Sequence, residues 1–335
     1  MTTAIVTHAH WDHVGGYTYL KSLNRDLKIY GRENSGGTVE RAQRHHSYDQ
    51  FRGAGFKHER IKDYRPDVAV GTRTQISIGG TEIELVPVSG GETEDALFVH
   101  FPGLEAIFVG DCLMPYYGEP WVEEGFIDEA VAAMMDEVIK RNPKYVLHGH
   151  RPLTLMYGPE QFKKFRGYFQ WLVDATRAHI RNGYSAKDIV HLNLIPPGLQ
   201  NHPDAYVSYL SPRNHLITRV ADRMGGIWRE DKTRHEPGGL DTLTAAEYGR
   251  FLQVYLDLSP RDISKALRRT IDGGDLELAL QMATAAIKRY PNDMAIKSLR
   301  EEAGDRLRSS VQFFDPLKFI AYTEMIGREH KPMPK

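Results

Sequence analysis

The first 150 residues alternate short apolar runs with polar, glycine-rich stretches, which is typical of a chain that forms both strands and helices. Residues 74–78 and 81–88 each alternate apolar and polar positions, and the glycine pair between them predicts a β-hairpin. Further runs have the length of buried strands: 4–6, 27–31, 96–101, 106–110 and 145–147. Helical spacing appears over 17–23 and 127–141, so the pattern predicts an α/β fold.

Two stretches depart from this alternation. Residues 32–67 are polar and weakly patterned. Such a stretch is expected either to form a wall or lid beside a binding site or to be an ordinary surface loop. From Gly273 to Asp293 the small residues and the terminal proline have the spacing of a tetratricopeptide-like helix pair, or of an ordinary helical hairpin. A single pair cannot bury its apolar face alone, so we expect it to pack on other parts of the chain.

Composition narrows the possible functions. The 335 residues include 43 basic and 44 acidic side chains, so the chain has no long-range field that would attract nucleic acid or an anionic membrane. The single cysteine, Cys112, excludes an internal disulfide and a cysteine-built zinc site. We expect no membrane span, because no run of about 18 apolar residues occurs. As given the chain fits the cytoplasm, or the periplasm or the exterior if an N-terminal signal has been lost.

Four metal-ligand side chains lie within six residues near the start of the chain, namely His8, His10, Asp12 and His13. They follow an apolar strand and precede Gly15-Gly16 and a helix, so they are expected on a loop at the strand's carboxyl end. In extended backbone His8 and His10 point to one side and can bind one divalent ion. Asp12 and His13, on the turn into the helix, face a second position, as in two-metal sites. A His-rich surface loop is the alternative.

The His-x-His-x-Asp-His loop resembles the first signature of the metallo-β-lactamase superfamily. The resemblance implies an αββα sandwich, and it implies further metal ligands at later strand ends, which match Glu92, Asp111 and His150. His150 is preferred to His148 because it lies two residues before Pro152, as the family's last histidine does. Members normally carry additional strands ahead of the loop, so we expect a partial sandwich and an N-terminally truncated chain.

Glu92 stands where most of the superfamily has a histidine, and this replacement resembles the alkylsulfatase branch. Asp111, in contrast, stands where those sulfatases have a second glutamate. Residues 180–189, 194–199 and 219–228 are similar to the helical dimerisation region of alkylsulfatases. The resemblance therefore implies a catalytic domain over residues 1–158 and a helical, dimerisation-like domain with the tetratricopeptide-like pair over 159–335. It also implies a homodimer.

By the same resemblance, a hydroxide held by two zinc ions per chain would cleave alkyl sulfate esters to alcohol and sulfate. One zinc would be bound by His8, His10 and Glu92, the other by Asp12, His13 and His150, and Asp111 would bridge them. Asp12 and Asp111 are the candidate catalytic residues, with Glu94 as a proton relay or a loop cap and His148 as a support behind the ligands. Arg44 and Tyr48 resemble part of the sulfatase pocket. An apolar channel for the alkyl tail is expected from Tyr116, Tyr117, Trp121 and Phe126.

Other functions remain open at this point. The sequence has no arginine between Asp111 and Lys140, where the sulfatases usually carry one, and this favours a hydrolase that acts on another ester or a lactone. A β-lactamase would need the histidine that Glu92 replaces. A non-enzymatic alternative is a truncated homologue that only dimerises through its helices, and bound metal would distinguish it from either enzyme.

Overall fold

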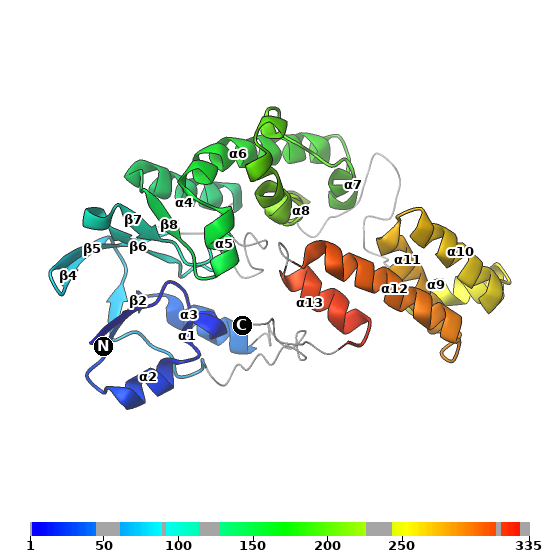
Figure 1. Cartoon of the computed structure of the whole chain (residues 1–335), viewed down its shortest axis with the longest axis horizontal. Coiled ribbons are helices and arrows are strands. Elements are labelled where there is room, and N and C mark those ends of the chain that lie inside the picture. The colour runs from blue at the N-terminus through cyan, green and yellow to red at the C-terminus, as the bar shows by residue number, and fades with distance from the viewer. Residues whose placement is uncertain are drawn as a thin grey trace. The chain divides into compact units, whose positions relative to one another are not determined.

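The computed structural model of the chain describes residues 2–44, 61–88, 92–113, 127–225, 243–312 and 316–328 (Figure 1). The described residues form two compact units, one ending at residue 225 and the other beginning at residue 243. Within the described ranges, no helix combines the length and the apolar character needed to cross a bilayer.

The first sheet is parallel, and its strands follow the order β1-β2-β3. Ala4 of β1 lies beside Ile29 of β2, and Gly31 of β2 lies beside Ala69 of β3. The strands are β1 (Thr3–Ile5), β2 (Lys28–Arg32) and β3 (Val68–Val70). The helices from the same part of the chain are α1 (Trp11–Val14), α2 (Tyr17–Leu23) and α3 (Ser35–Arg44). Buried residues such as Val14, Ile29 and Val39 join these elements in one apolar cluster.

The second sheet has the order β4-β5-β6-β7-β8, with an antiparallel course up to β7 and a parallel last pair. Its strands are β4 (Thr74–Ile78), β5 (Thr81–Pro87), β6 (Leu97–Phe101), β7 (Ala106–Phe108) and β8 (Tyr145–Leu147). The 3-10 turn η3 (Pro102–Leu104) joins β6 to β7. The predicted hairpin is therefore present, and the predicted strand over 145–147 matches β8.

Each face of the second sheet packs on a different layer. Leu85, Leu97 and Val99 form a cluster with Val70 of β3, so this face packs against the first sheet. Val86, Phe98 and Ile107 face the other way, into a core shared with helices. The elements that close that side are α4 (Ile127–Arg141), α5 (Arg151–Met156), α6 (Pro159–Arg181), α7 (Ala186–His191), η4 (Leu199–Asn201) and α8 (Pro203–Gly225). The layers thus run α-β-β-α, which confirms the predicted fold class.

Helices beyond residue 158 belong to this same unit. Phe162 and Phe165 of α6 and Tyr209 of α8 are fully buried in the core that includes Phe98 and Ile107 of the second sheet. The predicted division at residue 158 therefore falls inside a packed unit, because α6 and α8 supply much of the cover for that sheet. As a division between functions it stays a prediction.

The second unit is helical. Its core is built from apolar residues such as Leu267, Leu280 and Ala303, which come from three successive helices. The elements are α9 (Ala245–Arg250), the π-helical turn η5 (Phe251–Tyr255), α10 (Pro260–Asp272), α11 (Leu276–Ile287), α12 (Met294–Val311) and α13 (Pro316–Met325). The stretch predicted to hold a helix pair, 273–293, contains one helix, α11, and the next helix, α12, begins only at Met294. As expected of an apolar helix that cannot be buried alone, α11 packs on its neighbours α10 and α12.

Two elements differ from the sequence prediction. Part of the weakly patterned stretch 32–67 is the helix α3, whose buried Val39 and Thr38 face the protein interior. The strand β3 was not predicted, because three residues are too few for an alternating pattern to stand out.

Candidate metal centre

The loop from Val6 to His10 joins β1 to α1 and carries the first ligands. His8 and His10 are 3% and 5% exposed, and they are separated by the buried Ala9. His10 is the N-cap of α1 and still has extended backbone (φ −75°, ψ 154°), so the chain turns into a helix immediately after it. Asp12 and His13 therefore lie in the first helical turn, as the sequence predicts.

The first group of ligands is His8, His10 and Glu92, all of them buried. Glu92 precedes β6, and its Oε2 lies 3.0 Å from Nε2 of His8 and 2.9 Å from Nδ1 of His10. On the far side of the His8 ring, Oγ1 of Thr7 lies 3.2 Å from Nδ1. This contact holds the ring so that Nε2 is the nitrogen turned toward Glu92.

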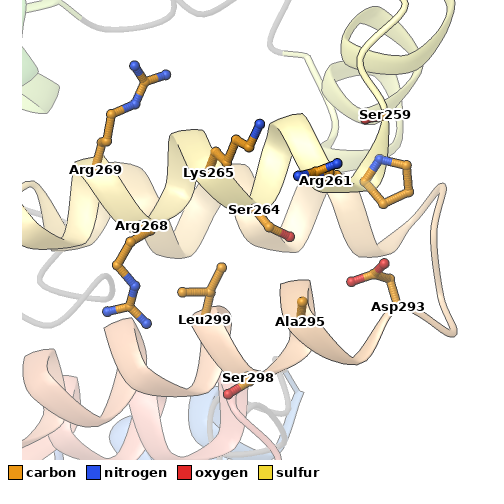
Figure 2. A pocket seen from close by; sticks show the side chains of 11 residues that line it. Ser259, Arg261, Ser264, Lys265, Arg268, Arg269, Asp293, Ala295, Ser298 and Leu299 are labelled. Carbon is orange, nitrogen blue, oxygen red and sulfur yellow. The ribbon is translucent and has the colours of Figure 1, made fainter.

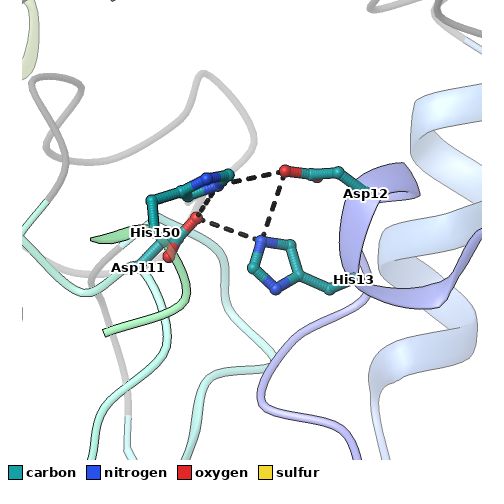
Figure 3. A group of neighbouring side chains, drawn as sticks. All are labelled: Asp12, His13, Asp111 and His150. Atoms are coloured by element: carbon teal, nitrogen blue, oxygen red, sulfur yellow. Dashed lines mark hydrogen bonds and ion pairs between the residues drawn. The ribbon is translucent and has the colours of Figure 1, made fainter. Parts of the chain in front are cut away.

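The second group consists of Asp12, His13, Asp111 and His150, in which carboxylates and imidazoles alternate (Figure 3). Oδ2 of Asp111, which follows β7, lies 3.1 Å from Nε2 of His13 and 3.0 Å from Nε2 of His150. Oδ2 of Asp12 lies 3.4 Å and 3.1 Å from the same two nitrogens. The candidate catalytic residues Asp12 and Asp111 thus lie on opposite sides of the two rings.

The two groups adjoin one another. The ring centroids of His8 and His13, one from each group, are 4.0 Å apart. All seven predicted ligands therefore lie together, at the ends of four separate strands of the first unit.

Two glycines allow these loops to approach. A Cβ on Gly149 would lie 2.4 Å from Oδ1 of Asp111 and 2.6 Å from Cε1 of His13. Gly110 has left-handed backbone (φ 58°), and a Cβ there would lie 2.8 Å from Cβ of Thr7. The amide of Gly149 donates to the carbonyl of Gly110 at 3.0 Å, which ties the loop that carries His150 to the loop that carries Asp111.

The charges of the second group stabilise one another. Burial opposes ionisation of Asp12 and Asp111, but hydrogen bonds from His13 and His150 hold the pKa of each carboxyl well below its usual range. Burial would lower the pKa of His13, yet its bonds to Asp111 and Asp12 raise that pKa to about 9. The same two carboxylates raise the pKa of His150 to about 10.

Glu92 is ionised for a similar reason. Burial would raise the pKa of its carboxyl, but His10 and His8 outweigh this and hold the pKa below its usual value. Buried carboxylates beside imidazoles are the donor set that zinc takes in proteins.

The orientation of these atoms fits metal ions. Nε2 of His8, Oε2 of Glu92 and Oδ1 of Asp111 are buried and meet no group with hydrogen-bond geometry among the described residues. In each group the ligand atoms lie within 4.8 Å of one another. Buried polar atoms are rarely left unsatisfied, so a shared cation is the simplest partner for these convergent donors.

His148 does not join either group. Its Nε2 lies 3.0 Å from the carbonyl oxygen of Tyr157, and its ring packs beside Tyr157 and Phe162 in the helical core. Burial lowers its pKa to about 4, so the ring is neutral and supports the loop before His150 from beneath. The choice of His150 over His148 as a ligand candidate is consistent with this placement.

Several candidate substrate residues lie outside what the structure describes. The backbone of Arg44 ends α3, but its side chain and the whole of Tyr48 fall outside the described residues. The residues proposed to line an apolar channel also lie outside them, namely Tyr116, Tyr117, Trp121 and Phe126. The pocket that would recognise a substrate therefore remains a prediction.

The sequence analysis missed the contacts that hold the Glu92 loop. Oγ1 of Thr38, on α3, donates to Oδ1 of Asp95 at 3.0 Å, and both residues are 1% exposed. Nδ2 of Asn34 donates to the carbonyl oxygen of Glu94 at 3.2 Å. Because α3 lies in the weakly patterned stretch, no sequence signal linked it to this loop.

Comparison with known proteins gives a consistent result. The profile of the Metallo-beta-lactamase superfamily matches residues 2–150. The structure of the stereoselective inverting sec-alkylsulfatase Pisa1 from Pseudomonas sp. matches with a TM-score of 0.72 and 15% identity, over 98% of this chain and 56% of that one. A double mutant of the sec-alkyl sulfatase PisA1 gives the same TM-score and identity, over 98% and 57%. Comparison with curated protein sequences found no match.

The sequence identity and the coverage of these matches limit the conclusion to the fold. At 15% identity, the likeness to the two sulfatase structures establishes the fold, including the helical region that follows the sandwich. The chain spans a little over half the length of those sulfatases.

Proposed function

Because residues 2–150 match the model of the Metallo-beta-lactamase superfamily, we propose that this chain is a metal-dependent hydrolase that cleaves alkyl sulfate esters to an alcohol and sulfate. The observation that carries the proposal is the convergence of seven imidazole and carboxylate side chains from four strand ends. The substrate class is supported by the fold shared with two sec-alkylsulfatase structures and by the glutamate at position 92.

We assign the ligands as two adjoining sets. His8, His10 and Glu92 would hold one zinc ion, Asp12, His13 and His150 a second, and Asp111 would lie between them. Two zinc ions bound there would supply a hydroxide nucleophile near neutral pH and would neutralise charge on the leaving oxygen. The chain then needs no serine or cysteine nucleophile, and Cys112, whose pKa is raised by burial, is suited to packing rather than to catalysis.

The two candidate catalytic carboxylates have different roles in this proposal. The Asp111 side chain is 1% exposed, and it holds Nε2 of His13 and Nε2 of His150 on one oxygen. The Asp12 side chain is 26% exposed and is the more accessible carboxylate of the second group. Asp12 is therefore the carboxylate of the second group that would orient the attacking oxygen.

A hydrolase of another ester or a lactone is the second candidate. The stretch between Asp111 and Lys140 contains no arginine or lysine, whereas a sulfate ester needs donors for its oxygens. The two candidates share the same ligands and differ only in the group that is cleaved.

The deciding experiment is a side-by-side assay of the purified, zinc-loaded chain. Dodecyl sulfate, a phosphate monoester and a lactone are the substrates, with zinc per chain measured on the same sample. We expect sulfate release from dodecyl sulfate, and none from a Glu92→Gln variant. The matched control is Glu82→Gln, which alters an exposed glutamate on β5.

The outcomes separate the candidates. Hydrolysis of the phosphate ester or the lactone with dodecyl sulfate left intact would replace the sulfatase assignment by the second candidate. About two zinc ions per chain are expected. A zinc content near zero would favour the inert homologue.

We also propose that the chain is a homodimer that associates through the helical region after residue 158. The support is the resemblance of residues 180–189, 194–199 and 219–228 to the dimerisation region of alkylsulfatases. Sedimentation velocity of the full chain is expected to give twice the monomer mass of 38.1 kDa. A monomer at micromolar concentration would contradict this.

A further inference from the structure

A groove with a strongly basic rim runs between α10 and α12 in the second unit (Figure 2). Its volume is about 1120 Å³. The α10 side is formed by Arg261, Lys265, Arg268 and Arg269, and Asp293 is the acidic residue among those that line it. We propose that this groove binds an extended acidic peptide segment of a partner protein.

The basic rim follows from the amphipathic pattern of α10. Ile263, Leu267 and Ile271 are buried against α11 and α12, so this face of the helix is fully used in the core. Arg261, Lys265 and Arg269 recur every four residues on another face and are exposed. The helix thus presents a row of cations that its own fold does not need for packing.

Most of this charge is unpaired within the unit. The guanidinium of Arg268 forks onto Glu302 of α12, with N–O distances of 2.7 and 2.6 Å, so its charge is neutralised and it bridges the two helices. The side chains of Arg261, Lys265 and Arg269 make no hydrogen bond or ion pair with any residue that the structure describes. Asp262 is an acidic neighbour on the same helix. The hydrogen bond from the Ser259 side chain lowers the pKa of its carboxyl most, and the charges of Lys265 and Arg261 lower it further.

The acidic residue in the lining is already engaged. Oδ1 of Asp293 accepts the amide of Ile296 at 2.9 Å and so caps the first turn of α12. In addition, the hydroxyl of Ser264, which lines the groove, is buried and has no hydrogen-bond partner among the described residues. The groove therefore offers cations and one unsatisfied hydroxyl to a ligand.

The spacing of the cations indicates the shape of that ligand. Four residues along a helix advance about 6 Å, so Arg261, Lys265 and Arg269 span about 12 Å along the groove. A row of that length cannot converge on one small anion. Alternate residues of an extended peptide are about 6.6 Å apart, so acidic side chains at every second position would meet successive cations.

The floor of the groove favours a peptide over a nucleic acid. Pro260, Ala295 and the 8%-exposed Leu299 are its apolar lining residues, and they suit the aliphatic side chains that would alternate with the acidic ones. None of the lining residues is aromatic, whereas single-stranded nucleic acids are usually bound by stacking their bases on aromatic rings.

The test is binding of a fluorescein-labelled peptide, Glu-Val-Glu-Val-Glu, to the full chain, followed by anisotropy. We expect binding that weakens with added salt, and no binding of the Gln-Val-Gln-Val-Gln analogue. A Lys265→Gln/Arg269→Gln variant should weaken binding about fivefold or more, because it removes two ion pairs with the peptide. The matched control is Arg250→Gln/Lys288→Gln, which removes one arginine and one lysine from exposed positions of the same unit outside the groove.

Each alternative outcome overturns the proposal. Equal weakening by the groove variant and the control variant would mean that the peptide responds only to net charge. Tighter binding of an oligothymidine than of the peptide would make the groove a nucleic-acid site. No binding of the acidic peptide at low salt would leave the basic rim as a solvated helix face.

Discussion

The two ligand groups draw on the same loop but differ in burial and charge. His8, His10 and Glu92 are all buried, and they contain one carboxylate. The second group has two carboxylates, and its Asp12 and His150 side chains are 26% and 44% exposed. A buried set of donors is suited to holding an ion permanently, whereas a set that is open on one side leaves room for substrate. The difference indicates that substrate approaches from the second group.

The largest effects are expected from removing one carboxylate of each group. Glu92→Gln should abolish binding at the first group and leave the second, and Asp12→Asn should do the reverse, because a neutral amide is a poor zinc ligand. Zinc per chain should fall from about two to about one in each variant. Elemental analysis after dialysis measures this, and cobalt spectra distinguish which group is lost. If either variant loses both ions, the groups are not independent and the comparison fails.

A smaller effect is expected from filling the space beside the second group. In Gly149→Ala the new Cβ would collide with Asp111 and His13. These two side chains would then be displaced, and the four ligands of the second group could not come together. We expect metal affinity at the second group to fall about 10- to 100-fold, with the first group unchanged. Titration calorimetry of the chelator-treated chain measures both sites. Gly16→Ala is the control, because nothing lies within 4 Å of a Cβ there. Equal loss in both variants would contradict the steric explanation.

The second group should also respond to pH. With pKa values raised to about 9 and about 10, His13 and His150 are protonated at neutral pH in the chelator-treated chain. Zinc needs neutral imidazoles, so binding there should release about two protons and tighten as the pH rises from 6 to 9. Calorimetry in buffers with different ionisation enthalpies counts the protons. Release of no protons would contradict the ion pairing seen in this group.

The raised pKa values of His13 and His150 also determine how the stability of the chelator-treated chain changes with pH. Because both imidazole pKa values are raised above the ordinary 6.5, their ion pairs stabilise the chelator-treated chain fully below pH 6.5. That contribution is lost as the pH rises through about 9 to 10. The melting temperature should therefore fall in this range, and it should fall less in Asp111→Asn, which lacks the shared carboxylate.

The sequence identified the side chains that the structure brings together better than it identified their surroundings, for physical reasons. Ligand positions are marked by residue type at strand ends, and strands such as 145–147 carry a clear apolar signal on their own. Thr38 and Asp95, in contrast, are joined by one hydrogen bond across 57 positions, which leaves no local pattern. Gly149 is recognisable only once Asp111 and His13 are placed beside it.

Packing between layers was equally hidden from the sequence. The period of α6 identifies an apolar face, but nothing in it shows that Phe162 and Phe165 share a core with Phe98 of the second sheet. The boundary at residue 158 was placed by resemblance, and the compact unit extends beyond it because that face needs a partner.

The smallest effect is expected at the support of the first group. Thr38→Val removes the hydroxyl that donates to the buried Asp95 carboxylate, and so loosens the loop that begins with Glu92. The contact of Asn34 with Glu94 remains, so we expect affinity at the first group to fall only about three- to tenfold. Thr38→Ser keeps the hydroxyl and should restore the affinity, which a general loss of packing at this site would not allow. Calorimetric titration measures the metal affinity of both groups in each variant. An equal loss of affinity at the second group would mean that α3 supports the whole centre. The two groups would then differ in exposure alone.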